Sequence, residues 1–163
     1  MRWAEFAAAS PELAKLCEER LLGPGVALLG TLRADGSPRI SPCEVYVVDG
    51  ELLLGMMWRS RKANDLHRDP RIAVHSIVIA KDDTAGDVKL YGRIRDIDDP
   101  GLRERYADVV EEAIAWRPKD PYHLFAVDIE QSGGISFGEG ARAIRWPPER
   151  GEEPIPHPDA GET

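Results

Sequence analysis

The arrangement of turn dipeptides between short apolar segments constrains the fold of this chain more than any other feature of its sequence. Asp-Gly pairs stand at residues 35–36 and 49–50, each between two segments rich in apolar residues. Such a pair favours a tight hairpin, because glycine adopts the positive φ angles that the turn requires. We therefore predict three antiparallel strands joined as a meander, over residues 26–32, 39–48 and 51–57.

The remainder of the chain carries helix signals and further short strands. Ser10, Ser60 and Asp99 stand at the N-cap positions of three predicted helices. These helices are expected to run from Pro11 to about Leu22, from Arg61 to about His67, and from Pro100 to just before Arg117. Further strands are predicted over 71–78, 88–97, 124–129 and 141–146. Short strands at this spacing favour a mainly β (α+β) fold, a small antiparallel barrel with flanking helices.

Length and charge exclude several classes of protein. The 163 residues suffice for one domain with a buried core. The net charge of −8 disfavours nucleic acid as a partner, and no apolar run is long enough for a signal peptide or a membrane span. We expect a cytoplasmic protein with a domain over 1–146. Residues 147–163 hold five prolines and five acidic residues, which predicts a flexible, solvated tail.

No common catalytic or metal-binding motif is present in the sequence. The four histidines are scattered, and the spacing of Cys17 and Cys43 matches no zinc site. Both cysteines are expected to be buried apolar residues, and we predict no metal site. The Walker loop, the dinucleotide fingerprint and the nucleophile elbow are all absent, and we name no catalytic residue.

One segment inverts the charge of the chain. Residues 59–71 contain five basic and two acidic residues, a local charge of +3. A helix start capped by Ser60, with Arg61 and Lys62 in its first turn, is suited to bind a phosphate group, and Arg39 enters a neighbouring strand where it can converge on the same point. The alternative is a solvated helix face that happens to be basic.

The order of several motifs resembles the pyridoxamine 5′-phosphate oxidase-like, FMN-binding split-barrel family. The resemblance rests on residues 29–42 (LGTLRADGSPRISP), 49–52 (DGEL), 60–66 (SRKANDL), 69–71 (DPR), 90–94 (LYGRI) and 123–129 (HLFAVDI). It covers roughly residues 10 to 146, and the Ser-Arg-Lys helix start is its most specific element. It implies a split antiparallel β-barrel of about six to seven strands.

The resemblance also implies a homodimer that holds FMN in a groove between its subunits. The phosphate would be bound by Arg39, Arg61 and Lys62. The complete set of candidate cofactor-binding residues is Arg39, Ile40, Ser41, Met56, Met57, Trp58, Ser60, Arg61, Lys62, Lys89 and Tyr91. For residues 56–58 the alternative is plain core packing, and Lys89 and Tyr91 are by themselves ordinary strand residues.

The implied function is that of a flavin-dependent oxidoreductase, in which hydride passes between FMN and a small-molecule substrate. Two alternatives stay open: a reductase of the same fold that uses the deazaflavin coenzyme F-420, and a carrier or sensor that binds flavin or heme without turnover. The oxidases that act on vitamin B6 carry an Arg-x-His pair that has no counterpart in residues 141–163, and Glu44 stands where they have a lysine. Vitamin B6 oxidation is therefore not expected.

Overall fold

A computed structural model of the chain describes residues 1–80, 84–137, 142–146 and 153–156. The strands are β1 (Val26–Leu32), β2 (Pro38–Glu44), β3 (Tyr46–Val48), β4 (Glu51–Met57), β5 (Arg71–His75), β6 (Asp87–Asp96), β7 (Tyr122–Ser136), β8 (Arg142–Trp146) and β9 (Glu153–Pro156). The helices are α1 (Trp3–Ala9), α2 (Pro11–Cys17) with a π-helical continuation over Glu18–Leu22, α3 (Arg61–Arg68) and α4 (Pro100–Ile114).

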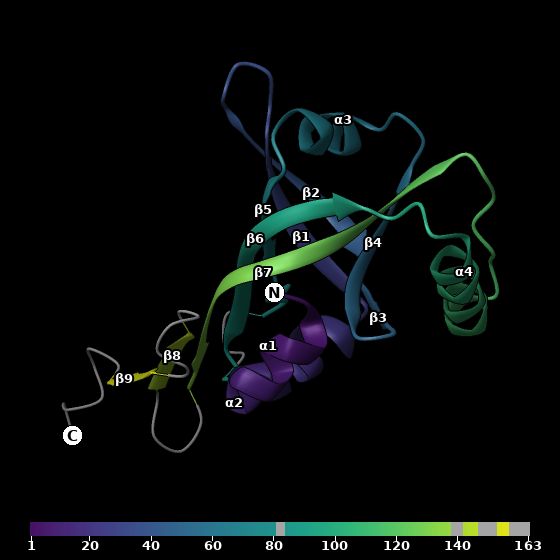
Figure 1. The fold of residues 1–163 in the computed structure, drawn as a ribbon. Coiled ribbons are helices and arrows are strands. Elements are labelled where there is room, and N and C mark those ends of the chain that lie inside the picture. Colours follow the sequence, from purple (N-terminus) through teal and green to yellow (C-terminus); the bar gives the residue numbers. More distant parts are fainter. Residues whose placement is uncertain (81–83, 138–141, 147–152, 157–163) are drawn as a thin grey trace.

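A single antiparallel sheet forms the body of the protein (Figure 1). Its strands follow the order β2-β1-β5-β6-β7-β4-β3, and β8 and β9 extend it beyond β7. β2 and β3 are almost contiguous in the chain, yet they stand at opposite ends of this order, so the sheet must curl back on itself. The curl brings β2, at one end of the strand order, against β4, near the other end. There the thiol of Cys43 on β2 lies 3.5 Å from the carbonyl oxygen of Gly55 on β4. The predicted split antiparallel barrel with flanking helices is confirmed.

The predicted meander of three strands is wrong in its middle member. Residues 39–48 do not form one strand, because β2 ends at Glu44 and β3 begins at Tyr46. Between them, the buried Val45 donates its N–H to the carbonyl of Gly25 at 3.1 Å instead of continuing the ladder. This break lets β2 pair with β1 while β3 pairs with β4, which then pairs with β7.

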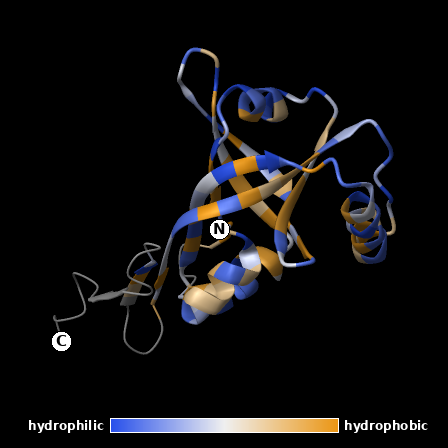
Figure 2. Ribbon diagram, viewed as in Figure 1, coloured by the Kyte–Doolittle hydropathy of each residue, from blue (hydrophilic) through white to orange (hydrophobic). Residues whose placement is uncertain are grey.

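Buried apolar residues form two clusters, one inside the curl and one under α4. Coloured by hydropathy, the strands show hydrophobic segments alternating with hydrophilic ones (Figure 2). Phe6, Leu29 and Phe125 belong to the cluster inside the curl, together with both cysteines. The second cluster joins Leu102, Tyr106 and Val110 of α4 to buried residues of β4 and β7. Ala113 and Ile114, at the end of the helix, are exposed.

Other segments also differ from the sequence-based expectation. The strand predicted over 71–78 ends at His75. No helix was predicted over Trp3–Ala9, where Trp3 and Phe6 are buried and Phe6 packs edge-on against Trp146 at 5.2 Å. The strand predicted over 124–129 extends to Ser136. Within the predicted tail, Glu153–Pro156 pairs with β8, while residues 147–152 and 157–163 lie outside the described ranges, so the predicted flexibility stays a prediction.

The helices occupy separate places around the curled sheet (Figure 1). α1 and α2 lie at one end of the curl, α3 lies at the other end near the connection between β1 and β2, and α4 stands to the side. Within the described ranges, no helix combines the length and the apolar character that crossing a membrane requires. The end covered by α3 is the one at which the predicted phosphate-binding residues meet.

Candidate functional site

A pocket of about 380 Å³ lies between α3 and the turn that joins β1 to β2. We call it the basic pocket. It is lined by Arg33, Ala34, Asp35, Arg39, Arg61, Asn64, Asp65 and Arg68. Four guanidinium groups thus face two carboxylates, and the local charge is positive in a chain whose net charge is −8. Arginine presents donors in a planar fork that matches the oxygens of a phosphate or carboxylate.

Asp65 organises the arginines of the basic pocket. Its side chain is only about 3% exposed and accepts hydrogen bonds from Arg39 Nε at 2.5 Å, Arg68 Nη2 at 2.9 Å and Thr31 Oγ1 at 3.0 Å. Burial alone would raise the pKa of Asp65, but these donors outweigh it and hold the pKa below its ordinary value. Because Arg39 is held through Nε, the terminal nitrogens of its guanidinium are left to meet a ligand.

The start of α3 supplies the remaining cations. Ser60 caps the helix as predicted, with its hydroxyl accepting from the N–H of Ala63 at 3.4 Å. Arg61 is exposed in the basic pocket, and within the described part of the chain no carboxylate pairs with it. Lys62 turns the other way, because its ammonium donates to the carbonyl of Pro42 on β2 at 2.6 Å. The structure therefore brings Arg61 and Arg39 together and holds Lys62 against the backbone of β2.

A second pocket, of about 390 Å³, opens on the outer face of the sheet and is here called the apolar groove. It is lined by Gly30, Thr31, Leu32, Pro38, Arg71, Ile72, Ala73, Tyr91, Gly92 and Glu130. Gly30 pairs across the sheet with Ile40 on one side and Ala73 on the other, and Ala73 pairs with Tyr91. The small residues Gly30 and Ala73 thus stand between the large side chains of Ile40 and Tyr91, which leaves a shallow trough. A Cβ on Gly30 would lie 3.4 Å from that of Ala73, so the trough would be partly filled without a clash.

The alternation of β2 divides the candidate residues of that strand between two faces. Arg39 and Ser41 are half-buried on the inner face, where Arg39 reaches Asp65. Ile40 is 67% exposed on the outer face, and Glu44 is exposed at the end of the strand. The strand thus contributes charge to the basic pocket and apolar surface to the side of the apolar groove.

Lys89 and Tyr91 lie on β6, and Tyr91 lines the apolar groove. Tyr91 is exposed next to an irregularity of the ladder between β6 and β7. Gly92 is needed there, because a Cβ at this position would lie 2.0 Å from the carbonyl oxygen of Asp128. Lys89 stands farther along the strand, with its ammonium 3.4 Å from Asp87.

Residues 56–58 do not share one environment. Met56 is 3% exposed and belongs to the core inside the curl, which is the packing alternative left open for it. Met57 is 79% exposed. Trp58 is half exposed, and its ring stacks on that of His123 at 4.5 Å. A ligand can therefore reach Met57 and Trp58 from solvent, whereas Met56 is enclosed in the core.

Comparison with known proteins places this geometry in a family. The family profile described as pyridoxamine 5′-phosphate oxidase matches residues 13–135, which is most of the chain. The chain belongs to this family. Both the basic pocket and the apolar groove lie within the matched residues. Among curated proteins, a sequence search finds no match.

Solved structures share the fold of this family member at low sequence identity. A Clostridium acetobutylicum protein related to general stress protein 26 has a TM-score of 0.62 and 19% identity over 90% of this chain and 96% of that one. A heme binding protein from Mycobacterium smegmatis has a TM-score of 0.60 and 18% identity over 78% of this chain, but only 56% of its own chain is covered. PhzG from Burkholderia lata 383, in complex with tetrahydrophenazine-1-carboxylic acid, has a TM-score of 0.60 and 12% identity over 94% and 91% of the two chains.

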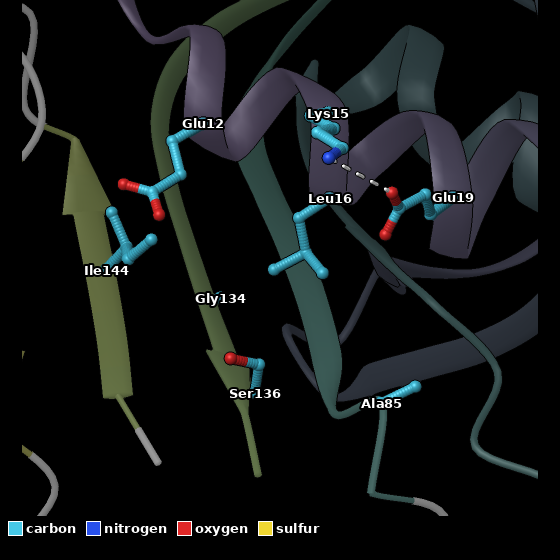
Figure 3. A pocket seen from close by; sticks show the side chains of 8 residues that line it. All are labelled: Glu12, Lys15, Leu16, Glu19, Ala85, Gly134, Ser136 and Ile144. Atoms are coloured by element: carbon cyan, nitrogen blue, oxygen red, sulfur yellow. Dashed lines mark ion pairs between the residues drawn. The ribbon is translucent and has the colours of Figure 1, made fainter. Parts of the chain in front are cut away.

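Another pocket of this family member, of about 310 Å³, lies between α2 and the strands β7 and β8 (Figure 3). Glu12, Lys15 and Glu19 of the α2 region point toward it, together with Leu16. The ammonium of Lys15 lies 4.0 Å from the carboxylate of Glu19. With two carboxylates against one ammonium, we call it the acidic pocket. It is unsuited to a phosphate and serves as an internal contrast to the basic pocket.

Two features of the site were not found by sequence analysis. Asp65 was counted only as one of two acids in a basic segment, and its role depends on the approach of Thr31 and Arg39 from other strands. His67 on α3 and His123 on β7 are in contact, with His67 Nε2 3.2 Å from His123 Nδ1, although 56 residues separate them in the chain. Motif spacing carries no signal for such a contact.

Thiol and metal chemistry find no support in the described residues. Cys17 and Cys43 are buried and unpaired to each other, as predicted. Burial raises the pKa of Cys17 to about 12 and also raises the pKa of Cys43, so both thiols stay protonated at neutral pH. Within the described ranges, no three histidine, cysteine or acidic side chains gather in a way that could hold a metal ion.

Proposed function

We propose that this protein binds FMN and acts as an oxidoreductase on a small molecule. The observation that carries the proposal is the basic pocket, in which Arg39 and Arg61 converge next to the start of α3. A helix N-terminus with arginines around it suits a phosphate monoester, because unpaired backbone N–H groups and cations favour the same anion.

The apolar groove adjoins the basic pocket along the chain. Thr31 and Leu32 line the groove, and the next residue, Arg33, lines the basic pocket. On β2, Pro38 lines the groove and its neighbour Arg39 lines the basic pocket. A ligand with an anionic group at one end and a flat apolar ring at the other suits this pair of surfaces. The residues present therefore fit the phosphate and the ring of FMN.

Each part of the site has a separate role in this proposal. Arg39 and Arg61 bind the phosphate, Asp65 orients Arg39, and Lys62 fixes β2 relative to α3. The apolar groove excludes water from the ring. Bound flavin supplies the hydride chemistry, and the protein supplies position and surroundings. No side chain of the site is assigned a proton transfer.

The proposal includes a homodimer. Ile40, Tyr91 and Met57 are large apolar side chains that are exposed on or beside the outer face of the sheet. A second copy that packs on this face covers them and closes the groove over the ring, and a two-fold pair is the commonest closed arrangement. Sedimentation of the full chain tests this point: a dimer is expected, and a monomer contradicts it.

Two alternatives share the same surfaces. Coenzyme F-420 has a longer anionic tail, and the basic pocket offers Arg33 and Arg68 beyond the arginines needed for one phosphate. A carrier of flavin or heme without turnover is favoured by the likeness to the heme binding protein of Mycobacterium smegmatis. Reduction of the bound cofactor by a nicotinamide, coupled to turnover of a substrate, distinguishes an enzyme from a carrier.

Titration with FMN, F-420 and heme tests the proposal. We expect FMN to bind most tightly and the double variant Arg61→Ala, Lys62→Ala to lose about tenfold or more in affinity. Arg61 then no longer gives the phosphate a charge-assisted hydrogen bond, which contributes roughly 1.5–3 kcal/mol, and Lys62 no longer fixes β2 beside the pocket. Lys15→Ala, in the acidic pocket, is the matched control and should bind FMN like the native protein. Unchanged FMN affinity in the double variant would remove the phosphate site.

A further inference from the structure

His123 lies at the centre of a stack of rings between β7 and α3. Its ring is stacked with Trp58 at 4.5 Å on one side and with Phe125 at 5.8 Å on the other. His67, in the last turn of α3, meets His123 edge-on, and His67 Nε2 lies 3.2 Å from His123 Nδ1. Both ring nitrogens of His123 are in hydrogen bonds, so each must act either as a donor or as an acceptor.

The backbone of Arg59 determines where the protons of this pair lie. The N–H of Arg59 donates to His123 Nε2 at 3.1 Å, which requires that Nε2 carries no proton. In the neutral ring the proton is then on Nδ1, and it is donated to His67 Nε2. His67 in turn carries its proton on Nδ1, which faces Asp96 Oδ2 at 3.7 Å. A metal ion cannot bridge the two rings in this state, because one of the facing nitrogens is protonated.

This chain of hydrogen bonds holds α3 at both ends. Arg59 precedes the helix in a left-handed conformation with φ of 55°, which is uncommon for a residue with a side chain. Its N–H is held by His123 and its carbonyl by the side-chain amide of Asn64 at 3.1 Å. At the other end of α3, His67 is held by the same imidazole. His123 is thus the hub that fixes the helix carrying Arg61.

An additional proton has no place in the pair. On His123 Nε2 it would displace the N–H of Arg59, and on His67 Nε2 it would face the proton of His123.

Charged groups from several elements surround His123. Asp96 on β6 favours protonation of His123, whereas Arg103 on α4 opposes it. The guanidinium of Arg59 lies over the ring of Trp58, 5.7 Å from its centroid. Asp98 and Asp120 line the neighbouring pocket, and Asp120 is paired with Arg103 at 2.8 Å. Burial is the main cause that lowers the pKa of His123, with His67 adding to it, so the ring is neutral at pH 7.

We propose that His123 is a positioning residue for the basic pocket and forms with His67 a latch that holds α3 in place and opens when the pair takes up a proton. The latch itself depends only on the geometry of the two rings and Arg59. Its effect on cofactor affinity rests on the proposed function.

The protonation pattern is tested on the native protein by long-range ¹⁵N nuclear magnetic resonance of the histidine rings. At about pH 7.5 we expect both His67 and His123 to carry the proton on Nδ1, the less common form of a free imidazole. On titration, His123 should gain its proton at a pH below 6.5, the ordinary pKa of histidine. A spectrum in which either ring carries its proton on Nε2 at about pH 7.5 would overturn the latch.

Amide hydrogen exchange tests what the latch does. After correction for the intrinsic pH dependence, exchange in α3 relative to α4 should rise about tenfold between about pH 7.5 and about pH 5.5, the factor expected when one hydrogen bond is lost. In His123→Phe, which keeps the ring stack, α3 should exchange fast at both pH values, while His75→Gln should respond like the native protein. An α3 that ignores pH in the native protein contradicts the proposal, as does a pH response that persists in His123→Phe.

FMN titration at the same two pH values separates the two proposals. If FMN binds, its affinity should fall on acidification in step with the exchange of α3. If α3 responds to pH and FMN binds at neither value, the latch stands and the proposed cofactor is wrong. If FMN affinity is constant while α3 loosens, His123 does not position the basic pocket.

Discussion

The basic pocket and the apolar groove meet at the hairpin of β1 and β2 and have opposite chemistry. The pocket draws its arginines from the turn after β1, from the inner face of β2 and from α3, where solvent reaches the charged ends. The groove draws Gly30, Ala73 and Tyr91 from the outer face of the sheet. The difference shows how one hairpin can serve an anion and a flat ring at once: its turn binds charge, and the alternation of its strands separates that charge from an apolar surface.

The two regions also differ in how they are held. Asp65 stands buried among three donors, so the basic pocket depends on a small polar network in which each partner needs the others. The groove depends on the size of the residues at its centre, and of its lining residues Thr31 alone donates to Asp65. Substitutions can therefore damage one region and leave the other intact.

The largest expected effect comes from removing the carboxylate that organises the basic pocket. Asp65→Ala leaves the guanidinium of Arg39 without its partner in a half-buried position, and we expect a loss of about 3–5 kcal/mol in unfolding free energy. Asp65→Asn keeps an acceptor for Thr31 and should lose less. Urea denaturation measures both. Equal stability of Asp65→Ala and the native protein would contradict the organising role of this residue.

Filling the groove should have a smaller effect, and on ligand binding alone. In Gly30→Leu, the new side chain occupies the trough beside Ala73, and its Cβ makes an ordinary contact at 3.4 Å. FMN affinity should fall by about tenfold or more, the loss of roughly 1.5 kcal/mol of apolar contact, whereas inorganic phosphate should still bind. Parallel titrations with the two ligands decide the matter, and a variant that loses both ligands equally would show that groove and pocket are not separate.

The smallest expected effect is a pH dependence of protein stability. It arises from His123, on the side of the molecule that carries the basic pocket. The pKa of His123 is lower in the folded protein than its ordinary value of 6.5, so the folded state binds fewer protons than the unfolded state. Its contribution to stability is complete above pH 6.5 and is lost as the pH falls toward the lowered pKa. Thermal unfolding of the native protein should show this decline, and His123→Phe should flatten it. The lowered pKa of Asp65 acts only below 3.8, outside this window.

Local signals predicted much of the fold. The Asp-Gly turn at residues 35–36 and the caps Ser60 and Asp99 are short-range features, and the hairpin and helices they indicate are present. The break at Val45 was not predicted, because the exchange of strand partners there depends on Gly25, a residue distant in sequence. The helix over Trp3–Ala9 was missed for a similar reason, since its aromatic residues are explained only by the core they enter.

The candidate site was predictable where it depends on residue type and not where it depends on contact. The cations Arg39 and Arg61 meet as expected from their chemistry. Lys62 is directed to the carbonyl of Pro42, a contact that no motif indicates. Met56 and Met57 are adjacent in sequence and alike in character, yet strand alternation buries one and exposes the other. The role of Asp65 also depends on elements brought together only by the curl of the sheet.

The comparison of FMN with riboflavin, which lacks the phosphate, tests the basic pocket most directly. The native protein should bind FMN at least about tenfold more tightly than riboflavin, and Arg61→Ala should remove most of that preference while leaving riboflavin affinity unchanged. Lys15→Ala should keep the native preference. Equal affinity of the native protein for the two flavins, or a preference for FMN that survives in Arg61→Ala, would contradict a phosphate site in the basic pocket.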